Sequence, residues 1–159
     1  MSFRWAAAAA VGVMVVPAVA SAQVLMQRDV SLRMALTIAE AALAECGTTT
    51  SVAIVDRAGR LRVFLQGDNA NPHNIELARR KAYTARTFRS PSGALVERLK
   101  ADPTLGLIHL TNVIANQGAL PIKVGDEVIG AAGASGAPGG EKDEACVKAG
   151  IDKVADLLK

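Results

Sequence analysis

VAIVDRAGRLRVFL is the sequence of residues 52–65, and it consists of two apolar runs separated by a short polar stretch. Residues 52–55 are mostly β-branched, residues 56–59 have the Asp-Arg-Ala-Gly chemistry of a turn, and residues 61–65 are again mainly apolar. This pattern predicts a β-hairpin, and strands joined by a hairpin are antiparallel. The stretch therefore favours an antiparallel sheet with helices packed on it over a parallel, doubly wound sheet.

The segment before the hairpin predicts an amphipathic helix that ends at Gly47, because its apolar residues recur at spacings of three and four. These positions are Leu32, Leu36, Ala39, Leu43 and Cys46. After the hairpin, Asn71-Pro72 predicts the start of a second helix that runs to about Arg89.

The second half of the chain repeats this logic. A short helix is expected at residues 91–100, strands at 107–113, 121–124 and 127–134, and a final helix after Gly139-Gly140. The predicted fold is an α/β protein of the α+β kind, with an antiparallel sheet of about five strands flanked by helices.

Size and composition exclude several classes of protein. A chain of 159 residues has room for one domain, and 50% hydrophobic residues are enough for one core. The net charge is only +3 and aromatic residues make up 3%, so the chain lacks the basic surplus and the stacking side chains of a nucleic-acid binder. The body of the chain has no apolar span of about 20 residues, which excludes a polytopic membrane protein.

The first 22 residues have the pattern of a secretory signal peptide. A short cationic start is followed by an apolar run at residues 5–19 and by the small residues Ala20-Ser21-Ala22. Cleavage would leave Gln23 as the new N-terminus, a single domain at residues 23–159, and no stable membrane insertion. An uncleaved anchor is the alternative, but the run is shorter than the roughly 20 residues that span a membrane. We expect a periplasmic or secreted protein.

Export decides how the two cysteines, Cys46 and Cys146, are interpreted, because an oxidising compartment allows them to form a disulfide. Two free thiols and half of a metal site are the alternatives. A zinc site is disfavoured because the sequence has neither a CxxC nor an HxxxH spacing.

The glycines of residues 130–140 precede the final helix, as in a phosphate-binding loop. The lysine and hydroxyl residue of a P-loop do not follow Gly140, and the next residues include the acids Glu141, Asp143 and Glu144. A phosphate would meet these carboxylates, so we interpret the glycines as turn and close-contact residues.

The helix at residues 71–89 carries the main candidates for a binding site. His73 would lie in the first turn, where the helix macrodipole favours the neutral imidazole that a metal can use. Lys81 follows roughly 12 Å further along the axis, beside Arg79 and Arg80. A metal-seeking nitrogen and carboxylate-seeking cations at this separation suit a flat, anionic cofactor. A solvated basic face with a capping histidine is the alternative.

Two further candidates are His109 and Thr111, in the predicted strand at 107–113. They would share a face of that strand, where a hydrogen-bonded core or edge histidine is the common case. No GxSxG elbow is present and neither cysteine has a convincing base, so we predict no catalytic residue for nucleophilic chemistry.

Several short motifs resemble the GlcG/HbpS family, and in their order they cover the chain from about Arg28 to its end. They are DRAGRL at 56–61, GDNA at 67–70, ARRKAYTA at 78–85, PI at 121–122 and GAAGASG at 130–136. The chain departs from many relatives at Gly118-Ala119, where they have two glycines, and at Gln66, where they often have an arginine.

The resemblance implies a profilin-like sandwich, assembly into homo-oligomers and a haem or related tetrapyrrole ligand, with a corrinoid or no cofactor as alternatives. Family members include haem binders, proteins described as haem-degrading, and domains that accompany corrinoid adenosyltransferases. We expect a binding, storage or sensing protein, with His73 as the iron ligand and Lys81, Arg80 and Arg79 near the propionates. Thr111 and His109 are further candidates near the pocket. Haem breakdown by an enzyme and a cofactor-free interaction module remain alternatives.

Overall fold

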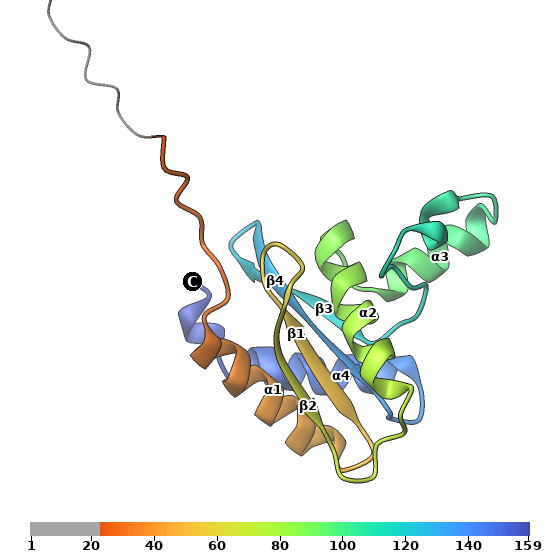
Figure 1. Ribbon diagram of the computed structural model, residues 1–159, viewed down its shortest axis with the longest axis horizontal. Helices are drawn as coiled ribbons and strands as arrows, with labels where there is room; N and C mark the ends of the chain where they lie inside the picture. Colours follow the sequence, from red (N-terminus) through yellow and green to blue (C-terminus); the bar gives the residue numbers. More distant parts are fainter. Residues whose placement is uncertain (1–22) are drawn as a thin grey trace, which may run out of the picture.

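Residues 23–159 are described by a computed structural model, in which helices cover both faces of a four-stranded sheet (Figure 1). The predicted signal peptide lies outside the described residues. The elements in chain order are α1 (Leu32–Cys46), β1 (Ser51–Val55), β2 (Leu61–Gln66), α2 (Asn74–Phe88), α3 (Gly93–Ala101), η1 (Gly106–His109), β3 (Ala119–Val124), β4 (Glu127–Ser135), α4 (Gly140–Asp152) and η2 (Ala155–Leu157).

The strands run in the order β2-β1-β4-β3, and every neighbouring pair is antiparallel. The predicted hairpin is β1–β2, with Ala53 opposite Phe64. The second hairpin, β3–β4, turns at Gly125-Asp126. The antiparallel α+β sandwich predicted from the sequence is therefore confirmed.

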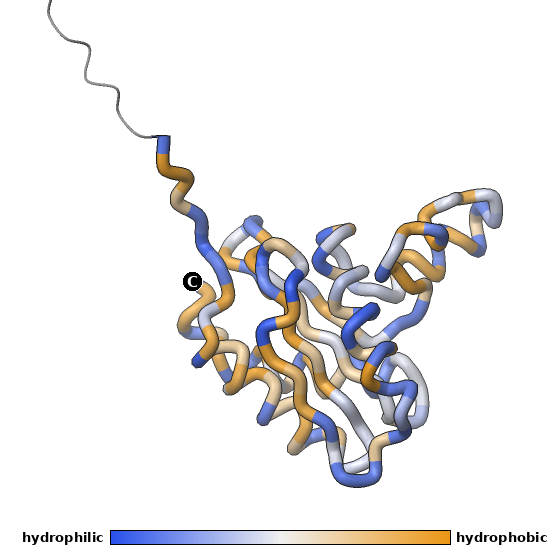
Figure 2. Tube along the Cα trace, in the orientation of Figure 1, coloured by the Kyte–Doolittle hydropathy of each residue, from blue (hydrophilic) through white to orange (hydrophobic). Residues whose placement is uncertain are grey.

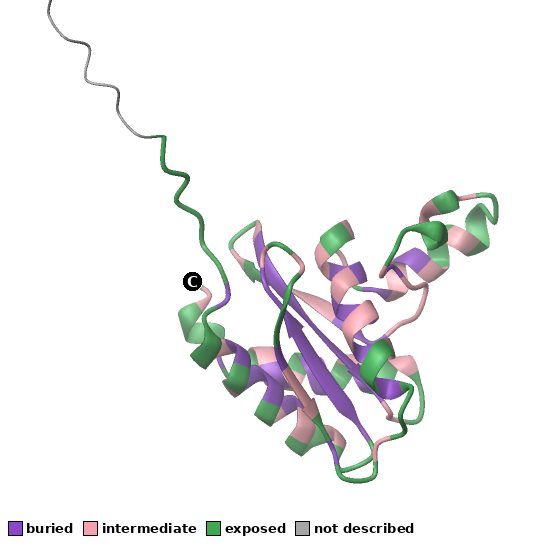
Figure 3. Ribbon diagram, viewed as in Figure 1, coloured by how far each residue is buried: buried purple, intermediate pink, exposed green. Residues whose placement is uncertain are grey.

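The two faces of the sheet pack against different helices. Alternate residues of β1 point to opposite sides: Val52 and Ile54 belong to the larger core under α1 and α4, whereas Ala53 and Val55 contact α2. Because both faces are covered, β1 is buried along its whole length (Figure 3). Hydrophobic colouring likewise runs along much of the sheet, whereas the loop that joins β2 to α2 is hydrophilic (Figure 2). No helix in this part of the chain is long and apolar enough to cross a membrane.

The first helix forms where the sequence predicts it, but its buried face differs from the expected one. Ala35, Ile38, Ala39 and Ala42 are fully buried, whereas Leu36, one of the expected positions, is 37% exposed. Small residues occupy the centre of the contact because α1 packs against both the sheet and α4. The larger leucines lie toward its margins.

The strand expected at residues 107–113 is wrong, and this explains why the sheet has four strands rather than about five. Residues 106–109 form the short 3-10 helix η1, which projects from the body together with α3 (Figure 1). The edge of β3 that an extra strand would need is partly occupied, because Ser92 bonds both the backbone N–H and the carbonyl of Ala119. Apolar residues of this segment, Ile108 and Leu110, are consequently exposed.

Helix α2 lies close to the sheet because alanine and glycine meet at the contact. Ala78, Ala82 and Ala85 are fully buried, as their spacing predicts. A Cβ at Gly133 of β4 would lie 2.6 Å from the backbone oxygen of Ala78 and 2.7 Å from the backbone nitrogen of Ala82. Both of these atoms belong to the backbone of α2, so a side chain at position 133 could be accommodated only if the helix moved away from the sheet.

Replacing Gly133 with alanine should therefore lower the free energy of unfolding by about 1–3 kcal/mol, the usual cost of overpacking. Gly106→Ala is the matched control, because the nearest atom to its Cβ would be a His109 carbon at 4.0 Å. Urea denaturation of both variants checks this. Equal stabilities of the two variants would contradict the close packing of α2.

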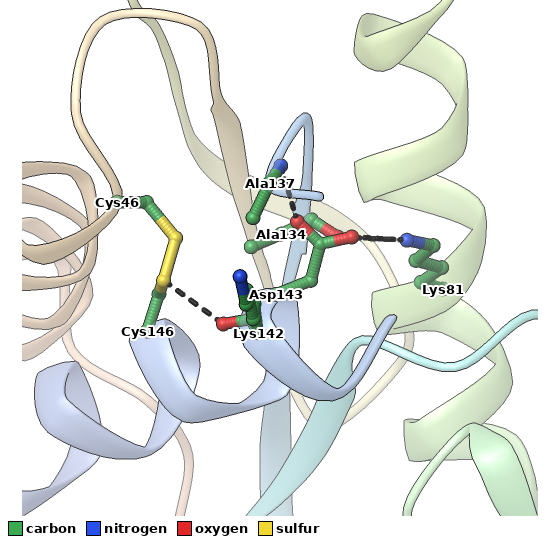
Figure 4. Close-up of a disulfide and its surroundings, with 7 residues drawn as sticks. All are labelled: Cys46, Lys81, Ala134, Ala137, Lys142, Asp143 and Cys146. Atoms are coloured by element: carbon green, nitrogen blue, oxygen red, sulfur yellow. Dashed lines mark hydrogen bonds and ion pairs between the residues drawn. A yellow bond between two sulfur atoms is a disulfide. The ribbon is translucent and has the colours of Figure 1, made fainter. Parts of the chain in front are cut away.

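The two cysteines form a disulfide that joins the end of α1 to α4 (Figure 4). Their Cα atoms are 5.6 Å apart, within the usual range for a bridge. No free cysteine remains among residues 23–159. Of the three alternatives left open by the sequence, the structure has the disulfide.

Candidate functional site

A polar cleft of about 290 Å³ lies where α2 and α4 begin and β4 ends, beside the loop that precedes β3. It is lined by Asn71, His73, Asn74, Leu77, Lys81, Asn116, Ser135, Gly136, Ala137, Gly139, Gly140 and Asp143. All but one of the side chains larger than alanine are polar or charged, so the cleft suits a polar group rather than an apolar body.

Glycines at 118 and 136 allow the chain to turn tightly around the cleft. Both have a positive φ, of +130° and +131°. A Cβ at Gly118 would lie 2.9 Å from the Nζ of Lys81 and 2.8 Å from the Cβ of Asp143. Glycine at this position therefore leaves the space in which the lysine and the aspartate meet.

The floor of the cleft is a buried ion pair between α2 and α4 (Figure 4). The Nζ of Lys81 donates to the Oδ2 of Asp143 at 2.8 Å and to the carbonyl oxygen of Ala134 at 3.1 Å. The other carboxylate oxygen of Asp143 accepts from the backbone N–H of Ala137. The side chains of Lys81 and Asp143 are only 3% and 4% exposed.

Burial raises the pKa of Asp143 above the ordinary value of an aspartate. The hydrogen bond and the charge of Lys81 act in the opposite direction and offset part of the effect. When both groups are ionised, the positive charge of Lys81 and the negative charge of Asp143 cancel. Each buried charge depends on the other, because either one alone would be unpaired in the interior.

Three polar side chains lie around the pair. Asn74 is buried and used internally, since it donates to the carbonyl of Thr49 and accepts from the hydroxyl of Ser135. Asn116 and Asn71 form no side-chain hydrogen bond within residues 23–159. These two amides are free to bind a ligand.

His73 lies at the rim of the cleft. It precedes the first residue of α2 at the cap position, where its side chain forms no capping hydrogen bond, and it is exposed to solvent. Its imidazole is therefore available to a ligand. The sequence predicts His73 in the first helical turn, and the structure places it one residue earlier, at the cap.

The cations predicted on α2 have different surroundings. Lys81 lies at the floor of the cleft in the ion pair with Asp143. Arg80 pairs with Glu76 at 3.2 Å and donates to the carbonyl of Val113, and Arg79 donates to the side-chain oxygen of Asn112. Both arginines hold the segment that follows η1 against α2, and both remain partly exposed.

His109 and Thr111 are not brought to the cleft. His109 ends η1, Thr111 is in the turn that follows, and both are exposed. Their neighbours Ile108 and Leu110 are 42% and 49% exposed, so this segment presents a histidine between apolar side chains. It is a surface separate from the residues that line the cleft.

Sequence reasoning missed the partner of Lys81. Asp143 was interpreted only as one of the acids at the start of the last helix, and it is 62 residues from Lys81 in the chain. Asn116 was missed as well, because an isolated asparagine before a turn carries no motif. The order of strands in the sheet is what brings these residues together, and no local pattern encodes it.

Fold and site together define a class: an α+β sandwich whose second helix presents a histidine at the rim of a small polar cleft. The model of the family described as haem degrading protein HbpS-like matches residues 30–152, and the chain belongs to this family. This confirms the resemblance found in the sequence motifs.

Three solved structures of similar proteins have the same fold, and one of them is a complex with haem. HbpS is 33% identical, with a TM-score of 0.77 over 88% of this chain and 98% of the other. A double mutant of Streptomyces reticuli HbpS is 30% identical, with a TM-score of 0.79 over 90% and 99% of the two chains. The complex of PduOC with haem is 25% identical, with a TM-score of 0.70 over 77% and 92%.

Proposed function

We propose that the chain is an exported protein that binds haem, for storage or sensing, through His73. The observation that carries the proposal is the exposed imidazole of His73, which has no capping hydrogen bond and lies beside a cleft in a protein of the HbpS-like family. The haem complex of the PduOC relative supports the same class of ligand.

The residues around His73 fit a haem that lies across the rim rather than one enclosed in the cleft. A volume of about 290 Å³ is just below the roughly 300–1,000 Å³ found for clefts that enclose a drug-sized ligand. The lining is polar, whereas a macrocycle needs apolar contacts, which Ile75 (45% exposed) and the half-buried Leu77 supply on the first turns of α2. The imidazole of His73 would bind the iron atom of such a haem.

Arg79 and Arg80 are better placed for the propionates than Lys81. Both are partly exposed and lie on the turns of α2 that follow His73. Lys81 is almost fully buried and its charge is balanced by Asp143, so a propionate would have to displace that carboxylate. We therefore assign Lys81 to the cleft and retain the two arginines for the propionates.

Titration with haemin tests the proposal, because the chain has only two histidines and both are exposed. His73→Ala should weaken haemin binding by about tenfold or more. Loss of a residue that only supports a metal ligand already lowers metal affinity about tenfold or more, and loss of the ligand itself should cost at least as much. It should also shift the Soret band. His109→Ala, the matched control, should bind as the wild type does.

The reverse result, with normal binding by His73→Ala and weak binding by His109→Ala, would move the site to the segment of η1 with Ile108 and Leu110. Unchanged spectra in both variants would exclude a histidine ligand.

Export rests on the signal-peptide pattern of residues 1–22. The intact mass of the protein recovered from its own cells should correspond to a chain that begins at Gln23. A mass that includes the first 22 residues would contradict cleavage.

Haem breakdown is the second candidate function, and the description of the family favours it. The reaction needs a reductant and oxygen from outside the protein. If the chain degrades haem, ascorbate should abolish the Soret band of the complex in air and yield a discrete tetrapyrrole product. A Soret band that persists under these conditions would indicate binding alone.

A further inference from the structure

The N-terminal segment, residues 23–28, leaves the body of the protein as an extended stretch before α1 (Figure 1). Every residue in it is exposed (Figure 3). Three large apolar side chains follow one another in this segment, and Val24, Leu25 and Met26 are 72%, 76% and 85% exposed. Single exposed apolar residues are common on protein surfaces, but three in succession on an extended stretch indicate a contact that one chain alone does not make.

The sheet has a free edge that suits such a stretch. Strand β2 is at the edge of the sheet and, among the residues that the structure describes, pairs only with β1. The outward N–H and carbonyl groups of an edge strand are a template for one more strand.

An apolar groove runs beside this edge, between β2 and α1. Its deepest part is a cleft of about 470 Å³ at the end of both elements, lined by Glu40, Leu43, Ala44, Gly47, Thr48, Leu65, Gln66, Gly67 and Asp68. Leu36 and Leu32 continue the stripe of Glu40 and Leu43 toward the start of α1, and they are 37% and 55% exposed. We call the edge of β2 together with this lining the β2 groove.

The N-terminal segment matches the β2 groove in length and in pattern. The segment and β2 each have six residues, which span about 20 Å in an extended chain. Alternate side chains of an added strand point to opposite faces, so Val24 and Met26 would lie on one face and Leu25 on the other. Both faces offer apolar contacts, because leucines of α1 flank β2 on one side and the half-buried Phe64 packs toward α2 on the other.

Charge favours an antiparallel arrangement. This orientation places Gln23 at the end of β2, where Glu40 and Asp68 line the groove. Both carboxylates are exposed, and neither forms an ion pair within residues 23–159. Cleavage before Gln23, which belongs to the proposed function, would give this residue an α-ammonium that meets the two acids. A parallel strand would place the ammonium beside Arg60 and Arg62 instead.

The base of the segment is fixed, and this favours the groove of another copy over the chain's own. The backbone N–H of Arg57 donates to the Oδ1 of Asp29 at 2.8 Å, and Arg28 pairs with Glu127 at 3.8 Å. Beyond these contacts the chain points away from its own sheet (Figure 1).

We propose that two copies of this chain exchange their N-terminal segments, so that residues 23–28 of each add an antiparallel strand to the β2 groove of the other. The contact is reciprocal, and a pair of copies therefore contains it twice. It uses no residue of the proposed haem site, so the two proposals fail separately.

Sedimentation of the chain that begins at Gln23, over a range of concentrations, tests the proposal. The wild type should sediment as a dimer or as a multiple of dimers. Leu25→Asp should weaken association about hundredfold, because burial of a leucine contributes about tenfold and the contact occurs twice. Ile108→Asp is the matched control, since Ile108 is an exposed apolar residue (42%) on η1, and it should associate as the wild type does.

Mixing two variants distinguishes exchange between copies from docking within one chain. Leu36→Asp alters the groove and leaves the segment intact, whereas Leu25→Asp does the opposite. A pair with one copy of each contains one intact contact, so the mixture should associate about tenfold more tightly than either variant alone. Both positions are exposed in the single chain, and folding should therefore tolerate both changes.

Four results would overturn the proposal. They are a wild type that remains monomeric, association of Leu25→Asp equal to that of the wild type, loss of association in Ile108→Asp instead, and a mixture that associates no better than its components. The third result would move the interface to η1. The first, together with slow amide hydrogen exchange along β2, would mean that the segment docks on its own chain.

Discussion

Removing the disulfide between Cys46 and Cys146 should lower the free energy of unfolding by about 4–5 kcal/mol. The bridge joins residues 100 apart, and in the chain-entropy model closing a loop of about that length restricts the unfolded chain by roughly 4.7 kcal/mol. It links the end of α1 to α4, and these two helices together cover one face of the sheet. A domain of this size has a total stability of only about 5–15 kcal/mol, so the reduced protein would be marginal.

Urea denaturation of the oxidised protein, of the reduced protein and of Cys46→Ala/Cys146→Ala measures this effect. Cys146 is 6% exposed, and alanine keeps much of its apolar character, so the loss should reflect the bridge more than a cavity. Dithiothreitol should destabilise the wild type and leave the double variant unchanged. A loss below about 1 kcal/mol on reduction would mean that the unfolded chain is not restricted by the bridge.

Replacing Lys81 with methionine should cost about 3–5 kcal/mol, the usual effect of leaving one member of a buried ion pair without its partner. The carboxylate of Asp143 would keep its bond from the backbone of Ala137 but lose the one cation that it pairs with among residues 23–159. Because burial already raises the pKa of Asp143, loss of Lys81 should raise it further and favour the protonated form at higher pH.

Replacing both members of the pair should recover most of this loss. Lys81→Met/Asp143→Leu leaves no charge behind, and apolar replacements of a buried pair are often neutral or stabilising. Thermal or urea unfolding of the single and double variants gives the coupling between the two sites. If Lys81→Met alone costs less than about 1 kcal/mol, water reaches the pair and the floor of the cleft is not as enclosed as the structure indicates.

Most of the fold follows from local patterns in the sequence. The hairpin of β1 and β2 is predicted by its turn residues, and α2 by the alanine spacing, although the helix begins at Asn74 rather than at the predicted Asn71-Pro72. The segment at 107–113 could not be predicted in this way. Its apolar residues suit a strand, but a strand needs a free edge to pair with, and Ser92 occupies part of the edge at Ala119.

The candidate site was predicted in part. His73 and Lys81 do line one cleft, as their spacing on a single helix predicts. Lys81 was expected to be an exposed cation near the propionates, but it is buried in an ion pair. The residues next to Lys81 in the sequence are the same in both cases, so they could not distinguish the two. What distinguishes them is Asp143, which reaches Lys81 only through the packing of α4 beside β4.

The absorption spectrum of the protein purified from its own cells, recorded before and after one equivalent of haemin, tests the proposed function most directly. We expect a Soret band that is already present or that appears on addition and saturates at one haem per chain, with a position that depends on His73. The proposal would be contradicted if the purified protein were colourless and the spectrum of haemin were the same with and without the protein.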